Sequence, residues 1–170
     1  MKKSLTILLL LTASIVFAKT SSTLMLTTGD DKEAGKALSS FLKAHGMKVQ
    51  TPPDTLKQKG YILLEYNDHI YFLSPKVMKD PTRIDRILIY EMFQIKKDKV
   101  STNEFKDWVL KLNNEFNIGS FSFAKDVFVV TSQLTFLNVL SIEEVKAFLK
   151  DFSMGVTNAL IMSGGDKYLK

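Results

Sequence analysis

Residues that could perform acid–base or metal chemistry are few in this sequence. His45 and His69 are the only histidines, and cysteine is absent. Neither histidine has a second histidine four residues away, which is the spacing that holds zinc on one helix face. A metal site would need carboxylates from unrelated segments. We therefore predict no metal, no cofactor and no catalytic residue, and we expect structural or surface roles for both histidines.

Ser40 and Lys43 have the Ser-x-x-Lys spacing of exported penicillin-recognising enzymes. On a helix, this spacing would place the lysine beside the serine hydroxyl, where it could activate a nucleophile. The intervening Phe41 and Leu42 belong to the expected apolar face of that helix, and the companion Ser-Asp-Asn and Lys-Thr-Gly elements are absent. We therefore do not predict a catalytic role for this pair.

Clusters of charge have structural interpretations. Asp30–Asp31 and Glu143–Glu144 fall at expected helix starts, where negative charge suits the helix dipole. The short basic cluster from Lys96 to Lys99 is interpreted as a solvated strand end. The formal charge of +5 falls by two if the leader described below is removed. Because a basic stripe with interleaved stacking aromatics is missing, we expect no nucleic-acid partner.

The first 18 residues are typical of a signal peptide. Met1 to Lys3 is positively charged, and Leu5 to Phe17 is an apolar run of suitable length. The run is short for a membrane span, and small residues near Ala18 favour cleavage after it. An uncleaved anchor is the alternative. We expect a periplasmic or secreted protein with no membrane span after cleavage.

Three helices are predicted in the mature chain. Asp30 or Asp31 caps the first, and His45-Gly46 ends it. Capping boxes at Ser101–Glu104 and Ser141–Glu144 begin the other two, because each serine and glutamate can satisfy the other's backbone donor. The residues after each start keep apolar side chains three and four positions apart, which is the spacing of one helix face.

Five strands are predicted from alternating or continuous apolar patterns and from turn residues. Asn67-Asp68 and Lys125-Asp126 join two hairpins, and Met47 to Gln50 is a candidate short extended piece. The strands are Gly60–Tyr66, His69–Ser74, Arg86–Ile95, Ile118–Ala124 and Val127–Leu137.

The expected fold class is α+β, with a single antiparallel sheet of about five strands and helices packed against it. The element order is helix, three strands, helix, two strands, helix. Residues 19–29 are expected to be a flexible lead-in, 30–163 a single domain, and 164–170 a polar tail.

In this order of elements the chain resembles the YbjN-like proteins, whose fold is similar to that of type III secretion chaperones. The resemblance is sharpest from Trp108 to Val156. It covers the Asn-containing end of the middle helix, the Phe-rich hairpin, and Ser141 to Val145 with Phe148 and Phe152. The turn Lys125-Asp126 lacks the family's glycine. The resemblance implies no catalytic residues, and it implies binding of partner segments by the sheet and helices.

Two functions remain open from the sequence. The first is a non-enzymatic, chaperone-like or regulatory protein-binding module of the cell envelope, which uses a sheet face, a sheet edge or a helix groove to hold an unidentified partner. A homodimer is compatible with it. The alternative is a small-ligand sensor or enzyme, with a pocket between sheet and helices that includes His69 with Tyr71 or Tyr61.

Overall fold

The computed structural model describes residues 21–26, 29–77, 85–100 and 102–170. The predicted leader and Ser101 lie outside these residues. The strands are β1 (Thr23–Met25), β2 (Lys48–Gln50), β3 (Ile62–Tyr66), β4 (His69–Lys76), β5 (Asp85–Gln94), β6 (Ser120–Ala124), β7 (Val127–Phe136) and β8 (Val139–Ser141). The helices are α1 (Asp31–Ala44), α2 (Asp54–Lys57), α3 (Asn103–Glu115), α4 (Ile142–Met162) and the 3₁₀ turn η1 (Gly165–Lys167).

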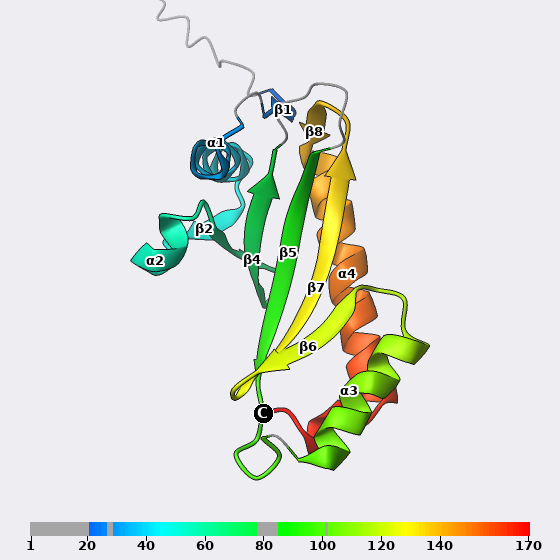
Figure 1. Ribbon diagram of the computed structural model, residues 1–170. Helices are drawn as coiled ribbons and strands as arrows, with labels where there is room; N and C mark the ends of the chain where they lie inside the picture. Colours follow the sequence, from blue (N-terminus) through cyan, green and yellow to red (C-terminus); the bar gives the residue numbers. More distant parts are fainter. Residues whose placement is uncertain (1–20, 27–28, 78–84, 101) are drawn as a thin grey trace, which may run out of the picture.

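Six strands form one antiparallel sheet in the order β2-β3-β4-β5-β7-β6 (Figure 1). The chain leaves β5, passes through α3 and returns at the sheet edge as β6, so that β7 lies between β6 and β5. β1 and β8 form a separate two-stranded antiparallel sheet. An α+β fold with an antiparallel sheet is thus confirmed, whereas a single sheet of about five strands is wrong.

The difference in strand number comes from short segments that have little pattern of their own. Met47 to Gln50 supplies β2, which pairs with β3 and becomes the edge strand. β1 lies within residues 19–29, the expected flexible lead-in, and its three residues pair with β8. The loop expected after Pro53 contains the single turn α2. Strands of three residues are too short for alternation to predict them, and only their pairing partners order them.

The two predicted hairpins are present. Asn67 and Asp68 connect β3 to β4 with φ angles of 49° and 64°, the left-handed conformation that a two-residue hairpin turn of this kind requires. Lys125 takes a φ of 56° in the turn between β6 and β7. Asn and Asp tolerate this conformation better than most residues, so the first turn agrees with its sequence more closely than the second.

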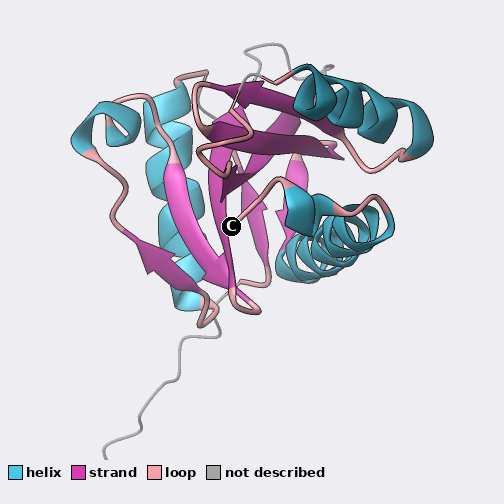
Figure 2. Ribbon diagram, turned by 90° about the horizontal axis from the view of Figure 1, so that it is seen from below, coloured by secondary structure: helices cyan, strands magenta, loops and turns pink. Residues whose placement is uncertain are grey.

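Helices cover one face of the sheet, which we call the inner face. α1 contacts β2 and β4, α4 contacts β7 and β8, and α3 contacts β6. Figure 2 shows α1 at one side of the strands and α3 and α4 at the other. Alternate residues on the strands, such as Tyr71, Ile89 and Phe128, point to this side and are buried in a single hydrophobic core.

The capping box predicted at Ser141 is confirmed. The Ser141 hydroxyl accepts from the Glu144 backbone N–H at 3.0 Å, and the Glu144 carboxylate accepts from the Ser141 N–H at 2.9 Å. The start of α3 differs by one residue, because Thr102 is its N-cap and its hydroxyl accepts from the Phe105 N–H at 3.2 Å. Threonine caps almost as well as serine, so local sequence does not choose between adjacent positions.

The Asn113 side chain joins α3 to the edge strand β6. Its amide donates to the Phe121 carbonyl at 2.8 Å and its oxygen accepts from the Phe121 N–H at 2.9 Å. The side chain thus replaces a neighbouring strand at this position. As a result, the exposed edge of β6 is already hydrogen-bonded at Phe121.

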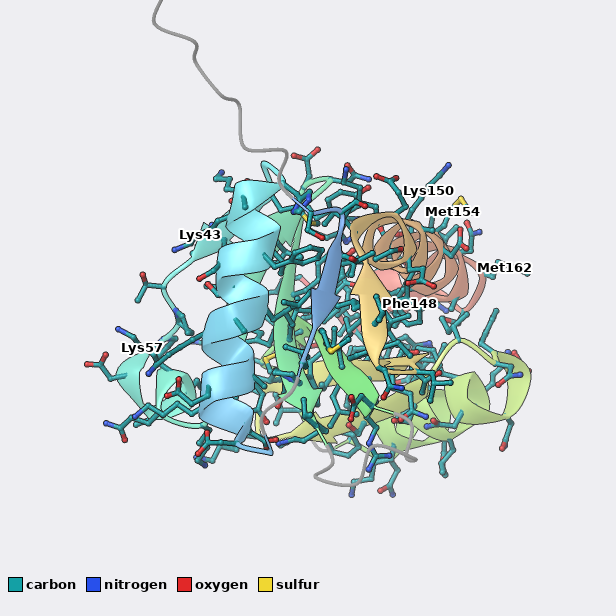
Figure 3. All side chains as sticks on the ribbon, turned by 90° about the horizontal axis from the view of Figure 1, so that it is seen from above. Lys43, Lys57, Phe148, Lys150, Met154 and Met162 are labelled. Carbon is teal, nitrogen blue, oxygen red and sulfur yellow. The ribbon has the colours of Figure 1, made fainter. Side chains whose placement is uncertain are left out.

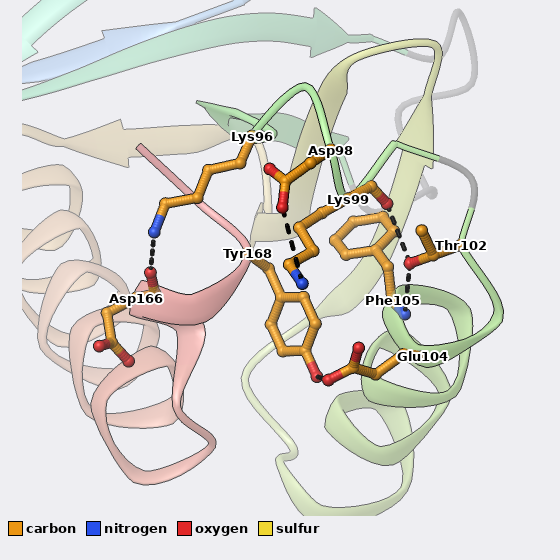
Figure 4. Close-up of polar contacts among 8 residues, drawn as sticks. All are labelled: Lys96, Asp98, Lys99, Thr102, Glu104, Phe105, Asp166 and Tyr168. Atoms are coloured by element: carbon orange, nitrogen blue, oxygen red, sulfur yellow. Dashed lines mark hydrogen bonds and ion pairs between the residues drawn. The ribbon is translucent and has the colours of Figure 1, made fainter.

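The C-terminal segment is not a polar tail. Tyr168 and Leu169 are buried, with Tyr168 stacked on Trp108 at 4.7 Å between ring centroids. The Tyr168 hydroxyl donates to Glu104 at 3.1 Å (Figure 4). The Lys96 N–H donates to the Tyr168 carbonyl at 2.8 Å. Two apolar residues in a short polar stretch carry no periodicity, so the sequence does not reveal that they complete the core.

We expect Tyr168→Ala to lower the free energy of unfolding by about 3 kcal/mol, because it removes a large buried aromatic side chain. Chemical denaturation of the purified chain would measure this change. Lys167→Ala is the matched control, because Lys167 is exposed and adjacent in the chain. A loss below about 1 kcal/mol for Tyr168→Ala would contradict the packing role of this segment.

Candidate functional site

His45 has a structural role at the end of α1. It is the C-cap residue of this helix, its Nδ1 lies 2.8 Å from the Phe41 carbonyl oxygen, and its ring lies 4.5 Å from the Phe41 ring. These contacts give the imidazole a structural role at the helix end.

His69 lies beside a buried polar cluster on the inner face. Its Nδ1 is 2.5 Å from Glu91 Oε1, and its ring stacks on Tyr71 with centroids 6.0 Å apart. His69 and Tyr71 belong to β4 and Glu91 to β5, where Glu91 is directly opposite Tyr71. The structure therefore brings His69 and Tyr71 together as hypothesised, and it adds Glu91, which the sequence analysis missed. This contact depends on the register of β4 and β5, and no local sequence motif predicts it.

Burial raises the pKa values of two acidic groups in this cluster. Glu91 is 3% exposed, and burial raises the pKa of its carboxyl group, with the His69 contact opposing that change. Burial also raises the pKa of Tyr71 to about 12, while the nearby Ser153 side chain acts in the opposite direction. Among the described residues, neither Glu91 Oε2 nor the Tyr71 hydroxyl has a partner with good hydrogen-bond geometry.

The geometry of this cluster does not favour catalysis. Tyr71 is fully buried and Glu91 nearly so, and only His69, with 28% of its side chain exposed, reaches water. A substrate would meet the imidazole but not the two groups that could assist it. We interpret the cluster as a polar element of the core.

Ser40 and Lys43 lie on the exposed side of α1 and line a pocket of about 440 Å³ between α1, α2 and the start of β3. We call it the lysine pocket. Its cationic side chains are Lys32, Lys36, Lys43 and Lys57, and its neutral polar lining includes Ser39, Ser40, Gln50 and Tyr61. No hydrogen bond joins Ser40 to Lys43 within the described chain, so the pair has no sign of an activated serine. Tyr61 lies here, apart from His69 and Tyr71.

The outer face of the sheet carries an uncovered set of apolar side chains, which we call the outer apolar face. Leu63, Phe72 and Tyr90 are directly opposite one another on β3, β4 and β5. Ile70 and Met92 are 49% and 44% exposed. The members are Leu63, Ile70, Phe72, Leu88, Tyr90, Met92, Val127 and Val129, and none of them belongs to the hydrophobic core cluster.

In Figure 1, α4 lies behind β7, and no described helix crosses in front of β4, β5 or β7. Strands about 4.8 Å apart and residues about 3.4 Å along each strand place the outer apolar face within roughly 300 Å². Ile70 and Met92 are exposed and the other six members are half-buried. The largest apolar patch on the surface of a monomer is often functional. The sequence shows apolar residues on both faces of the β3–β4 hairpin in places, but it does not show that only one face is covered.

The other charged residues considered in the sequence analysis make contacts that stabilise the fold. Asp30 caps α1 by accepting from the Lys32 and Glu33 backbone N–H groups. Glu144 completes the capping box of α4. In the basic cluster, Lys96 donates to the Asp166 carbonyl and so holds the C-terminal segment (Figure 4).

No group of three or more His, Cys, Asp or Glu side chains that could hold a metal occurs among the residues that the structure describes. Within the same residues, no helix has the length and hydropathy needed to cross a membrane.

Glu91→Gln provides a pH-dependent prediction. The pKa of Glu91 is higher in the folded state than its ordinary value of 4.5. Below about pH 4.5 the carboxyl group is protonated in both states and its full contribution to folding stability is present. That stability is lost as the pH rises through the raised pKa. Glutamine does not titrate and still offers an oxygen to His69. The stability of Glu91→Gln relative to the native chain should therefore increase as the pH rises above about 4.5.

Thermal unfolding of both proteins between about pH 4 and about pH 7 would test this dependence. Glu115→Gln, an exposed glutamate at the end of α3, is the control. If the melting temperature of Glu91→Gln stays constant or falls relative to that of the native protein as the pH rises over this range, the assignment is contradicted.

Comparison with known proteins gives one informative likeness. No protein-family model matches the sequence, and no curated protein matches it significantly. A search of solved structures finds YbjN from E. coli, named there as a candidate transcription regulator, with a TM-score of 0.55 and 11% sequence identity. The alignment covers 86% of this chain and 99% of that one. Identity this low supports a likeness of fold alone, and the resemblance seen in the sequence is confirmed at that level. The chain has a YbjN-like fold.

Proposed function

We propose that this chain is an exported, non-enzymatic protein-binding module of the cell envelope, with a chaperone-like or regulatory role. The observation that carries the proposal is the outer apolar face. A YbjN-like fold is consistent with a protein-binding or regulatory module, and the buried cluster around Glu91 does not favour catalysis. Export rests on the charged start and apolar run of residues 1–18.

A sheet can bind a protein segment along its edge or across its face, and the contacts here favour the face. The β6 edge is occupied at Phe121 by Asn113. The opposite edge strand, β2, has three residues and is followed closely by α2. Neither edge offers a long row of free backbone groups.

The outer apolar face suits an apolar segment of another protein of the envelope. Its centre is the row of Leu63, Phe72 and Tyr90, and aromatic side chains of this kind dominate the energetics of protein interfaces. At one border, Lys48 and Gln50 both contact the Glu65 carboxylate, at 2.5 and 2.7 Å. This polar border around an apolar centre is the usual anatomy of a transient interface.

We expect the double variant Ile70→Thr/Met92→Thr to weaken partner capture by about tenfold or more, because it removes two exposed apolar contacts. Threonine retains strand propensity, so the sheet should persist. The mature chain, residues 19–170, would be immobilised and exposed to detergent-solubilised envelope extract, and retained proteins would be quantified by mass spectrometry.

The matched control is Met154→Gln/Ile161→Gln, which changes two exposed apolar residues on α4. Circular dichroism would confirm that both variants fold. Equal capture by the Ile70/Met92 variant and the native chain would refute binding at this face. Retention of the chain itself, as a second copy, would identify the face as a homodimer contact.

Export makes a separate prediction. Mass spectrometry of the protein recovered from its native cell should find an amino terminus at Lys19. An intact Met1 would refute cleavage after Ala18 and favour the uncleaved anchor.

A further inference from the structure

The lysine pocket lies beyond the proposed protein-binding role and outside the outer apolar face. Its volume, about 440 Å³, is within the range of small-molecule sites. Three of its four lysines come from α1, where Lys32, Lys36 and Lys43 are spaced by four and seven residues and therefore share one helix face. Lys57 of α2 lies across the pocket from them.

The charged side chains that line this pocket are all positive. None of the described residues that line it is acidic. Lys36 contacts Glu33 at 2.7 Å, whereas Lys43 and Lys57 form no ion pair with a described residue. Like charges gathered around one hollow destabilise each other, and a bound anion would relieve that repulsion.

The pocket is also formed by rigid backbone contacts. The backbone at Gly35 of α1 packs against Gly60, so closely that a Cβ atom at Gly35 would lie 2.3 Å from the Gly60 carbonyl oxygen. Gly60 has a φ of 79°, a conformation that glycine adopts without strain. This contact fixes α1 against the start of β3 and holds the lysines on either side of the hollow.

The neutral lining defines the kind of anion. Ser39 and Ser40 offer hydroxyl donors and Tyr61 a phenol, while Pro52 and Ile62 provide apolar surface. Lysine ammonium groups bind phosphate as point charges, and hydroxyl groups add directional hydrogen bonds. We propose that the lysine pocket binds a phosphorylated ligand, either a small soluble organic phosphate or the phosphate of an anionic lipid headgroup.

The test uses the purified mature chain and two named probes. Isothermal titration with inorganic pyrophosphate measures binding of a soluble phosphate. Sedimentation with vesicles of phosphatidylcholine, with and without phosphatidylglycerol, measures binding of a lipid phosphate. Neither measurement requires the protein partner, so failure of the partner proposal would leave these results unaffected.

The informative variant is Lys43→Gln/Lys57→Gln. Figure 3 shows Lys43 and Lys57 near α1 and α2, and Lys150 on α4 across the molecule. The matched control is Lys150→Gln/Lys106→Gln, which removes the same charge from exposed positions outside the pocket. We expect about tenfold or greater loss of affinity in the pocket variant, and about twofold or less in the control.

Binding of pyrophosphate that depends on Lys43 and Lys57 would establish a soluble phosphate site. Binding only to phosphatidylglycerol vesicles, with the same dependence, would establish a headgroup site. Absence of binding to both probes would overturn the proposal. Equal weakening by the pocket and control variants would also overturn it, because net charge would then account for the affinity.

Discussion

The described helices cover one face of the six-stranded sheet, while the other face carries the outer apolar face among polar side chains. This mismatch between apolar surface and available cover is the constraint on which the rest of the structure depends. On the inner side, α1, α3 and α4 bury Tyr71, Ile89 and Phe128 in a continuous core. On the outer side, Phe72 and Tyr90 are half-buried, and none of the helices that the structure describes covers them. Contact of apolar surface with water is unfavourable in proportion to its area. A partner that covers this side would therefore bind with a favourable hydrophobic contribution to the binding free energy.

The inner layer is completed by segments that are distant in sequence. Tyr168 stacks on Trp108 and its carbonyl accepts a hydrogen bond from the Lys96 N–H, so the C-terminal segment ties α3 to the end of β5. At the other end of the molecule, β1 pairs with β8 and precedes α1. These contacts close the core at both ends. The outer apolar face and the lysine pocket lie outside this closed core.

Those two surfaces adjoin each other. Tyr61 lines the lysine pocket, and its ring lies 6.0 Å from the ring of Tyr90 on the outer apolar face. Gln50 also lines the pocket and is directly opposite Leu63, a member of the outer apolar face. The pocket and the face therefore meet at the β2–β3 edge of the sheet. A ligand in one would lie next to a partner on the other.

Local sequence determined the types and approximate limits of the longer elements. Three such features are the alternation in β7, the capping box at Ser141 and the Asn67-Asp68 turn. Each depends on residues within a few positions of one another, so each can be predicted from the sequence alone. Short elements such as β2 and α2 have too few residues for a period. The start of α3 moved by one residue because Ser101 and Thr102 are nearly equivalent as caps.

Tertiary structure alone decided which apolar residues are covered, which charges meet and where the C-terminal segment packs. Burial of Tyr168 depends on Trp108, and the contact of His69 with Glu91 depends on the register of β4 and β5. Lys57 lies near the three lysines of α1 because Gly35 and Gly60 let α1 approach this segment closely. The spacing of apolar residues reflects only interactions between neighbours along the chain. The burial of a residue and the charges around it depend on segments that are far away in the sequence.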